Sequence, residues 1–157
     1  IERAPDAVAA LDWDACDRAP AWLALDDAGL TTFQCRVGAV LCARALRLWI
    51  DGPRLAAARA ILGDDFLAQV LAQPDSASIP LGLVGAPRID SATQVGPALQ
   101  SAGASVLLAS LAHGPLRQAV GVMLAPAAPS TMTHELADTL VARAHALDHD
   151  AAARVAA

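Results

Sequence analysis

Apolar residues recur at helical spacing along most of the chain, and short breaks rich in Pro and Gly separate the helical stretches. The first stretch is weak and covers residues 5–18, where Val8, Leu11 and Ala15 fall on one face of a helix. Residues 19–23 then form a turn or a short helix that contains Trp22, a large side chain expected to anchor this segment to a core.

The strongest helical pattern runs from Thr31 to Ile50. Thr31 and Gln34 have the spacing of a capping box, which favours a helix start at this point. Apolar residues from Phe33 to the Leu48–Ile50 end occupy more than one side of the helix. A helix that is apolar on several sides is expected to be central in the fold.

The segment Asp51-Gly52-Pro53 ends that helix and begins the next one. Asp51 has the side chain of an N-cap, and Pro53 is tolerated in a first turn. Gly63 suits the left-handed position after a helix, and a further short helix is predicted to end at Gln73. Two short helices joined at one glycine predict a tight helical hairpin or corner.

Residues 74–95 form the longest irregular stretch, since they contain three prolines and two of the ten glycines. Their apolar content is too high for a disordered linker. We expect a loop packed on the core, and this loop is the place where an exposed apolar groove would be sought.

Three more helices are predicted beyond this loop. The first runs from about Pro97 to His113 and carries small residues that favour close packing, and the second is Pro115–Leu124, with Met123 and Leu124 facing inward. The third starts near residue 134, after a cap at Thr131 or Thr133, and continues into the 150s.

The composition agrees with an all-α fold. The chain of 157 residues contains 39 Ala and 22 Leu, the best apolar helix formers, and aromatic residues make up only 3%. The sequence predicts a compact single-core bundle of about seven mostly short helices. Residues 1–157 are expected to form a single helical domain that is a fragment of a somewhat longer chain.

Missing residue types limit the chemistry. All 11 basic residues are Arg and there is neither Lys nor Tyr, which excludes P-loop, Ser-Lys and Schiff-base mechanisms. The net charge of -5 argues against nucleic-acid binding, and no apolar stretch reaches the ~20 residues that span a bilayer. Cys35 and Cys42 lie seven residues apart in apolar surroundings and are expected to be buried thiols. We expect no enzymatic activity and no cofactor.

His145 and His149 are the one pair with metal-ligand spacing, because an i, i+4 separation places both rings on the same helix face. The pair lies in a polar stretch without a His-Glu-x-x-His motif, and a solvated helix face explains it without a metal.

The central part of the chain resembles the SctK family, the YscK/PscK-type cytosolic accessory proteins of bacterial type III secretion systems. The residues that carry the resemblance are residues 41–55, with Arg44, Arg47 and Asp51-Gly52-Pro53, then Ala60-Ile61-Leu62-Gly63-Asp64-Asp65-Phe66-Leu67, and upstream Pro20-Ala21-Trp22-Leu23. The family pattern is an Arg-bearing helix, an Ile-x-Gly break, a short helix that ends in Leu-Gly and a helix that carries Phe. It covers about residues 20–75.

The resemblance implies a non-catalytic adaptor of the sorting platform. Such a protein would link the cytoplasmic domain of the inner-membrane ring protein to the pod protein, and would be cytoplasmic and held near the inner membrane by these partners. By the same resemblance, Arg44, Arg47, Asp51 and Arg54 could form a partner-binding surface, although helix solvation and capping explain each of them as well.

Two alternatives remain open. One is a generic helical protein-binding regulator or chaperone-like module, with an apolar groove near residues 74–95. The other is a small metal-binding helical enzyme that uses His145, His149 and nearby aspartates.

Overall fold

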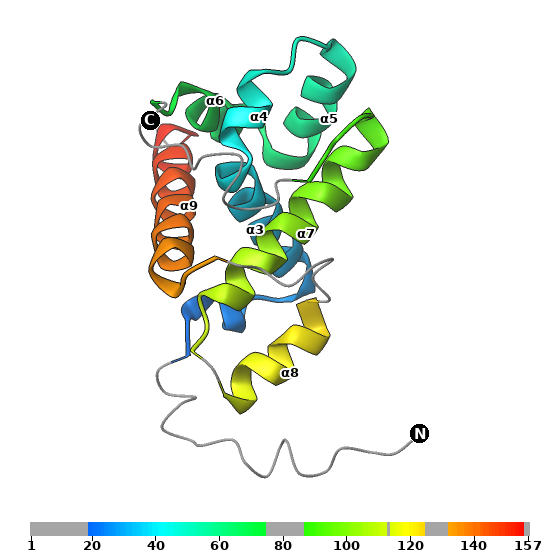
Figure 1. The fold of residues 1–157 in the computed structure, drawn as a ribbon. Coiled ribbons are helices and arrows are strands. Elements are labelled where there is room, and N and C mark those ends of the chain that lie inside the picture. The colour runs from blue at the N-terminus through cyan, green and yellow to red at the C-terminus, as the bar shows by residue number, and fades with distance from the viewer. Residues whose placement is uncertain (1–18, 75–86, 113, 125–131, 156–157) are drawn as a thin grey trace.

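A computed structural model describes residues 19–74, 87–112, 114–124 and 132–155, and beyond residue 150 only the backbone (Figure 1). These residues form an all-α fold of seven α-helices and two short 3₁₀ helices, with no strand among them. The elements are η1 (Ala21–Ala24), α3 (Asp27–Leu41), α4 (Ala43–Arg47), α5 (Gly52–Leu62), α6 (Asp64–Ala72), η3 (Ala92–Gln94), α7 (Val95–Ala109), α8 (Pro115–Leu124) and α9 (His134–Val155). The helix predicted over residues 5–18 lies outside the described residues.

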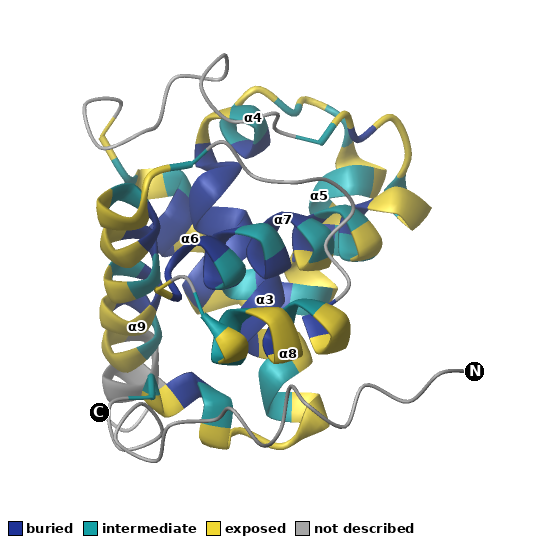
Figure 2. Ribbon diagram, turned by 60° about the horizontal axis from the view of Figure 1, so that its bottom comes forward, coloured by how far each residue is buried: buried dark blue, intermediate teal, exposed yellow. Residues whose placement is uncertain are grey.

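Helix α3 is the centre of the fold, as predicted from its apolar surface. It packs along α7 in the most extensive helix contact of the described residues, and it also touches α4, α5, α9 and η1. Its C-terminal half is buried on all sides, from Phe33 to Leu41 except for the half-buried Arg36. Figure 2 shows this buried interior, with the exposed residues on the outer faces of α5, α8 and α9.

Two glycines allow α3 and α7 to approach each other closely. A Cβ atom at Gly38 of α3 would lie 1.9 Å from the backbone oxygen of Leu99. A Cβ atom at Gly103 of α7 would lie 1.8 Å from the backbone oxygen of Gln34. Any larger residue at either position would force the helices apart, so this crossing depends on the absence of two side chains.

A pair of glutamines lies beside the glycine crossing. The side chain of Gln34 is 4% exposed, and its Oε1 accepts a hydrogen bond of 3.1 Å from Nε2 of Gln100. A buried amide is costly when it lacks a partner, and the bond from α7 offsets part of that cost.

Helix α9 covers the side of the bundle formed by α3, α6 and α7. The ring of His145 lies 4.5 Å from the ring of Phe33 on α3. Arg36 of α3 pairs with Asp148 and also stacks over the ring of Phe66, 5.3 Å from its centroid. The inner face of α9 therefore contributes polar as well as apolar contacts to the core.

The prediction of a single helix from Thr31 to Ile50 is wrong at both ends. The helix begins earlier because Asp26 is the N-cap: its carboxylate accepts a hydrogen bond of 2.7 Å from the backbone N–H of Gly29. It ends at Leu41, and Cys42, with φ -87° and ψ 7°, separates it from the short helix α4.

The corner that follows agrees with the prediction. The Asp51 side chain accepts a hydrogen bond from the N–H of Arg54, and Pro53 stands in the first turn of α5. Gly63 ends α5 with φ +81°, a conformation that favours glycine, and it is also the N-cap of α6.

The later helices lie close to their predicted positions. Helix α7 starts two residues before Pro97, α8 has the predicted bounds, and Thr133 Oγ1 accepts a 3.4 Å hydrogen bond from the N–H of Leu136 at the start of α9. In the predicted loop, residues 75–86 lie outside the described residues, and the remainder holds the short helix η3.

One continuous apolar core holds these helices together. Trp22 is 2% exposed and belongs to this core, as predicted, and Leu46 of α4 is completely buried. Other fully or nearly fully buried members are Val37, Phe66, Val70, Val95, Leu99, Val106, Leu107 and Ala137.

Candidate interaction surfaces

The four residues predicted to bind a partner lie at the corner between α4 and α5, but they have different surroundings. Arg47 donates a hydrogen bond from Nη1 to the backbone oxygen of Gln73, at the end of α6. Arg44 is exposed and makes neither a hydrogen bond nor an ion pair with the residues that the structure describes. Of the two arginines on α4, Arg47 is thus fixed by a contact with α6, whereas the Arg44 side chain extends into solvent.

Asp51 and Arg54 form an ion pair, and Arg54 also contacts nearby residues of the same chain. Arg54 pairs with the Asp51 carboxylate and donates a 2.8 Å hydrogen bond from Nη1 to the backbone oxygen of Ile89. Its guanidinium also lies over the ring of Trp49, 5.1 Å from the centroid. The hydrogen bond from the Arg54 N–H, together with the charge of the Arg54 side chain, lowers the pKa of Asp51. These contacts fix the course of the chain between α4 and α5.

Two large apolar side chains at the same corner face solvent. Leu48 is 67% exposed and Ile50 is 97% exposed. The sequence pattern predicts that both residues belong to a long helix and face the core. That prediction is wrong because α4 ends at Arg47 with Leu48 as its C-cap, so the helix does not continue through Trp49 and Ile50. We call Arg44, Leu48, Trp49 and Ile50 the corner surface.

A second exposed apolar surface lies on α8. Val122 is 83% exposed and Met123 is 69% exposed, whereas Val120 and Leu124 on the opposite side of the helix are buried. The prediction that Met123 faces inward is therefore wrong, and the one for Leu124 is confirmed. With Pro115 and Ala119, which are also exposed, Val122 and Met123 form a stripe at helical spacing that we call the α8 surface.

The two surfaces lie at opposite ends of the molecule. In Figure 1 the corner between α4 and α5 is at the top and α8 is at the bottom, with the crossing of α3 and α7 between them. Single exposed apolar residues are common on proteins, whereas exposed apolar residues that are neighbours make these two surfaces the candidates for an interaction.

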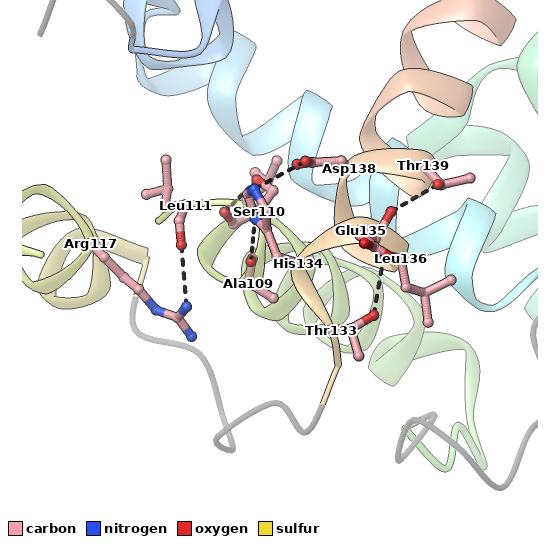
Figure 3. Close-up of polar contacts among 11 residues, drawn as sticks. Ala109, Ser110, Leu111, Arg117, Thr133, His134, Glu135, Leu136, Asp138 and Thr139 are labelled. Carbon is pink, nitrogen blue, oxygen red and sulfur yellow. Dashed lines mark hydrogen bonds and ion pairs between the residues drawn. The ribbon is translucent and has the colours of Figure 1, made fainter. Parts of the chain in front are cut away.

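Polar contacts fix the end of the bundle that carries α8 (Figure 3). His134, the first residue of α9, has its Nδ1 3.3 Å from the backbone oxygen of Ala109 at the end of α7, and its Nε2 3.2 Å from a carboxylate oxygen of Asp138. Arg117 of α8 donates a 3.2 Å hydrogen bond to the backbone oxygen of Leu111. These bonds connect α8 and α9 to the last turn of α7.

Among the described residues, the histidine pair on α9 belongs to no group of side chains that could hold a metal. The described residues contain no group of three or more His, Cys, Asp and Glu side chains placed to hold a metal ion. His145 and His149 are both exposed, and the ring of His145 lies against the ring of Phe33. The metal-binding alternative therefore finds no further ligands in this part of the chain.

Cys35 and Cys42 are buried free thiols, as predicted. Burial raises the pKa of Cys35, and it raises the pKa of Cys42 to about 12. A thiol with a raised pKa is a poor nucleophile because little thiolate is present at neutral pH. Both cysteines therefore act as small apolar residues of the core; Cys16 lies outside the described residues.

Within the part of the chain that the structure describes, no helix is both long enough and apolar enough to cross a membrane.

No family model matches the chain, and neither a curated protein nor a solved structure matches it significantly. The residues that sequence reasoning missed are Leu48, Ile50, Val122 and Met123. Their exposure follows from where α4 ends and from how α8 is turned on α7, and neither feature has a local sequence signal.

Proposed function

We propose that this protein is a non-catalytic adaptor that holds two protein partners at opposite ends of a rigid helical body. The observation that carries the proposal is the pair of exposed apolar surfaces at the two ends, one at the α4–α5 corner and one on α8 (Figure 1). A linker between two proteins needs two separate contact faces and no reactive centre.

The resemblance of residues 20–75 to the SctK family suggests the partners. They would be the cytoplasmic domain of the inner-membrane ring protein and the pod protein of a type III secretion sorting platform. The protein would then reside in the cytoplasm beside the inner membrane through these contacts. The missing residue types and the low reactivity of the two described thiols agree with a role without chemistry.

The four residues named by that resemblance divide into two groups in this proposal. Asp51 and Arg54 maintain the corner through their mutual ion pair and the bond to Ile89, whereas Arg44 is available for a direct contact. Arg47 connects α4 to the end of α6 through Gln73. Substitution of Arg54 would therefore impair a partner contact indirectly, by moving the corner.

Binding to the two candidate partners tests the proposal. The chain is mixed with each purified partner and with both together, and the complexes are separated by size and weighed by light scattering. We expect a ternary complex of one copy of each. The substitution Ile50→Asp should abolish binding of one partner only, and Val122→Asp should abolish binding of the other.

Two results would contradict the adaptor. One is the absence of binding to either partner by a folded, monodisperse sample. The other is competition between the partners for one surface, which would leave a helical protein-binding module with a single binding face.

A further inference from the structure

We infer that the corner surface binds a protein partner that presents an apolar face bordered by carboxylates. This inference deepens the proposed function and rests on it, because it assigns the chemistry of the partner at one of the two ends. It starts from the exposure of Leu48 and Ile50 and from the exposed, positively charged Arg44 next to them.

The exposed side chains stand on a turn whose backbone is held in place. The N–H of Leu48 donates to the oxygen of Ala45 over 3.1 Å, and the N–H of Trp49 donates to the oxygen of Leu46 over 3.2 Å. Leu46 itself is completely buried. The exposed residues therefore directly follow a buried anchor, and a partner would bind them without first ordering a loop.

Arg54 holds the other side of the turn. Its guanidinium stacks on Trp49 and also bonds to Asp51 and to the backbone oxygen of Ile89. Trp49 is therefore half-buried beneath Arg54, while the neighbouring Ile50 extends into solvent at 97% exposure.

The charge next to the apolar residues is positive. Arg44 precedes Leu48 by four residues, and Leu48 keeps helical backbone angles, so both side chains lie on the same face. Arg44 is exposed and has no ion-pair partner among the described residues. Farther along, the arginines Arg54 and Arg59 are paired with Asp51 and Asp64. Arg44 therefore offers a positive charge to a partner, and a carboxylate on the partner would complement it.

Other occupants of this surface fit less well. A second copy of the chain offers the α8 surface as its other exposed apolar face, but residues 115–124 contain no acidic residue. Two corner surfaces that faced each other would bring like charges together. An anionic membrane would be repelled by the net charge of -5 of the whole chain. An apolar face with an acidic border on another protein matches both the exposed aliphatic residues and Arg44.

The test uses the full chain and two synthetic peptides of 15 residues. One peptide places Leu at helical spacing with Glu elsewhere, and the second has Lys in place of every Glu. Binding is measured by fluorescence anisotropy at low and at high salt. We expect the Glu peptide to bind with weaker affinity at high salt because screening reduces the contribution of Arg44, and the Lys peptide not to bind.

Four variants locate the binding surface. Ile50→Ser should weaken binding of the Glu peptide by about tenfold, the loss expected when one buried aliphatic side chain is removed from a contact. Ile50→Leu should restore it. Arg44→Gln should weaken binding and reduce its salt dependence. Leu25→Ser, at an exposed aliphatic residue before α3 that lies outside both surfaces, is the control and should leave binding unchanged.

Several outcomes would overturn the inference. The first is that the Glu peptide does not bind at about 1 mM, a concentration that corresponds to about 4 kcal/mol of binding free energy. The second is that the Ile50→Ser variant binds the Glu peptide as tightly as wild type does. The third is that the Lys peptide binds as tightly as the Glu peptide. Ile50-dependent binding to vesicles of phosphatidylcholine and phosphatidylglycerol, without peptide binding, would assign the surface to a membrane instead. If the peptide fails while the two partners still bind, only the acidic chemistry is wrong; if the peptide binds and the partners do not, the adaptor proposal fails alone.

Discussion

The crossing of α3 and α7 and the corner between α4 and α5 use similar apolar residues for opposite purposes. At the crossing, Gly38 and Gly103 remove the side chains that would separate the helices, and the surrounding residues are almost completely buried. At the corner, Leu48 and Ile50 are left in solvent although buried residues precede them. The comparison shows that the crossing stabilises the fold through close packing, whereas the exposed apolar residues of the corner contribute little to the packing of this chain.

Substitution of the crossing glycines should have the largest effect on stability. In the variant Gly103→Ala the new Cβ meets the backbone oxygen of Gln34 at 1.8 Å, so the helices must move apart. We expect a loss of at least about 4 kcal/mol in the free energy of unfolding, measured by urea denaturation with circular dichroism. Gly38→Ala should behave in the same way.

The matched control is Gly52→Ala, since a Cβ at Gly52 meets no atom within 4 Å. This variant should change stability by no more than about 1 kcal/mol, and in the stabilising direction. Equal effects of Gly52→Ala and Gly103→Ala would show that the close approach of α3 and α7 does not limit stability.

Truncation of Leu46 and of Leu48 should have very different effects on stability, because one is buried and the other is exposed. Leu46 is 0% exposed and Leu48 is 67% exposed. Leu46→Ala should cost about 2–5 kcal/mol of unfolding free energy because it leaves a cavity. Leu48→Ala should change it by less than about 0.5 kcal/mol. Thermal denaturation of the two variants side by side checks the difference, and a large loss for Leu48→Ala would mean that this residue is part of the core.

Acidification should weaken the corner through Asp51. The pKa of this carboxyl is lowered in the folded protein, chiefly by the hydrogen bond from the Arg54 N–H. The unfolded chain therefore takes up the proton first, and the stabilisation by ionised Asp51 is present at neutral pH and decreases as the pH falls below about 4.

The variants Asp51→Asn and Asp51→Ala measure this effect. Asn keeps a capping side chain without the charge, whereas Ala removes the cap. At pH 7 we expect wild type to be more stable than Asp51→Asn, and Asp51→Ala to be the least stable. Urea denaturation at pH 7, 5 and 3 should show the difference between wild type and Asp51→Asn shrinking toward pH 3. A constant difference would mean that the Asp51 charge does not contribute.

The buried thiols Cys35 and Cys42 should react with a disulfide reagent only after the chain unfolds. This prediction concerns the rate of modification and not the free energy of unfolding. Burial raises the pKa of Cys42 to about 12, so the folded protein has almost no Cys42 thiolate at pH 8. In a Cys16→Ser background, a disulfide reagent should modify Cys35 and Cys42 slowly without denaturant and rapidly in guanidinium. Rapid modification of Cys42 in the folded protein would show that the core around α3 is open.

The local features of the fold were predictable from the sequence where one residue dominates the backbone. Asp51 as a cap, Pro53 in the first turn and Gly63 with its positive φ are decided within a few residues of each position. The bounds of α8 were predictable for the same reason, because Gly114 and Pro115 begin it.

Other bounds were not predictable because two local signals compete or none exists. Asp26 and Thr31 both have capping side chains, and the carboxylate of Asp26 is the one that bonds to a backbone N–H. The break at Cys42 has neither Pro nor Gly, and no sequence signal marks it. The end of α4 at Arg47 likewise has no sequence signal, and since the exposure of Leu48 and Ile50 follows from it, their place on the surface could not be found from the sequence.

By itself the sequence determined an all-α protein, because an abundance of Ala and Leu favours helices wherever they stand. It also determined the capped corner at Asp51 and the small residues that let α7 pack closely. Only the tertiary structure decided that Gly38 and Gly103 meet, and which apolar residues remain outside. The physical reason is that burial depends on the neighbours that each helix face finds in space, and residues far apart in the chain supply those neighbours.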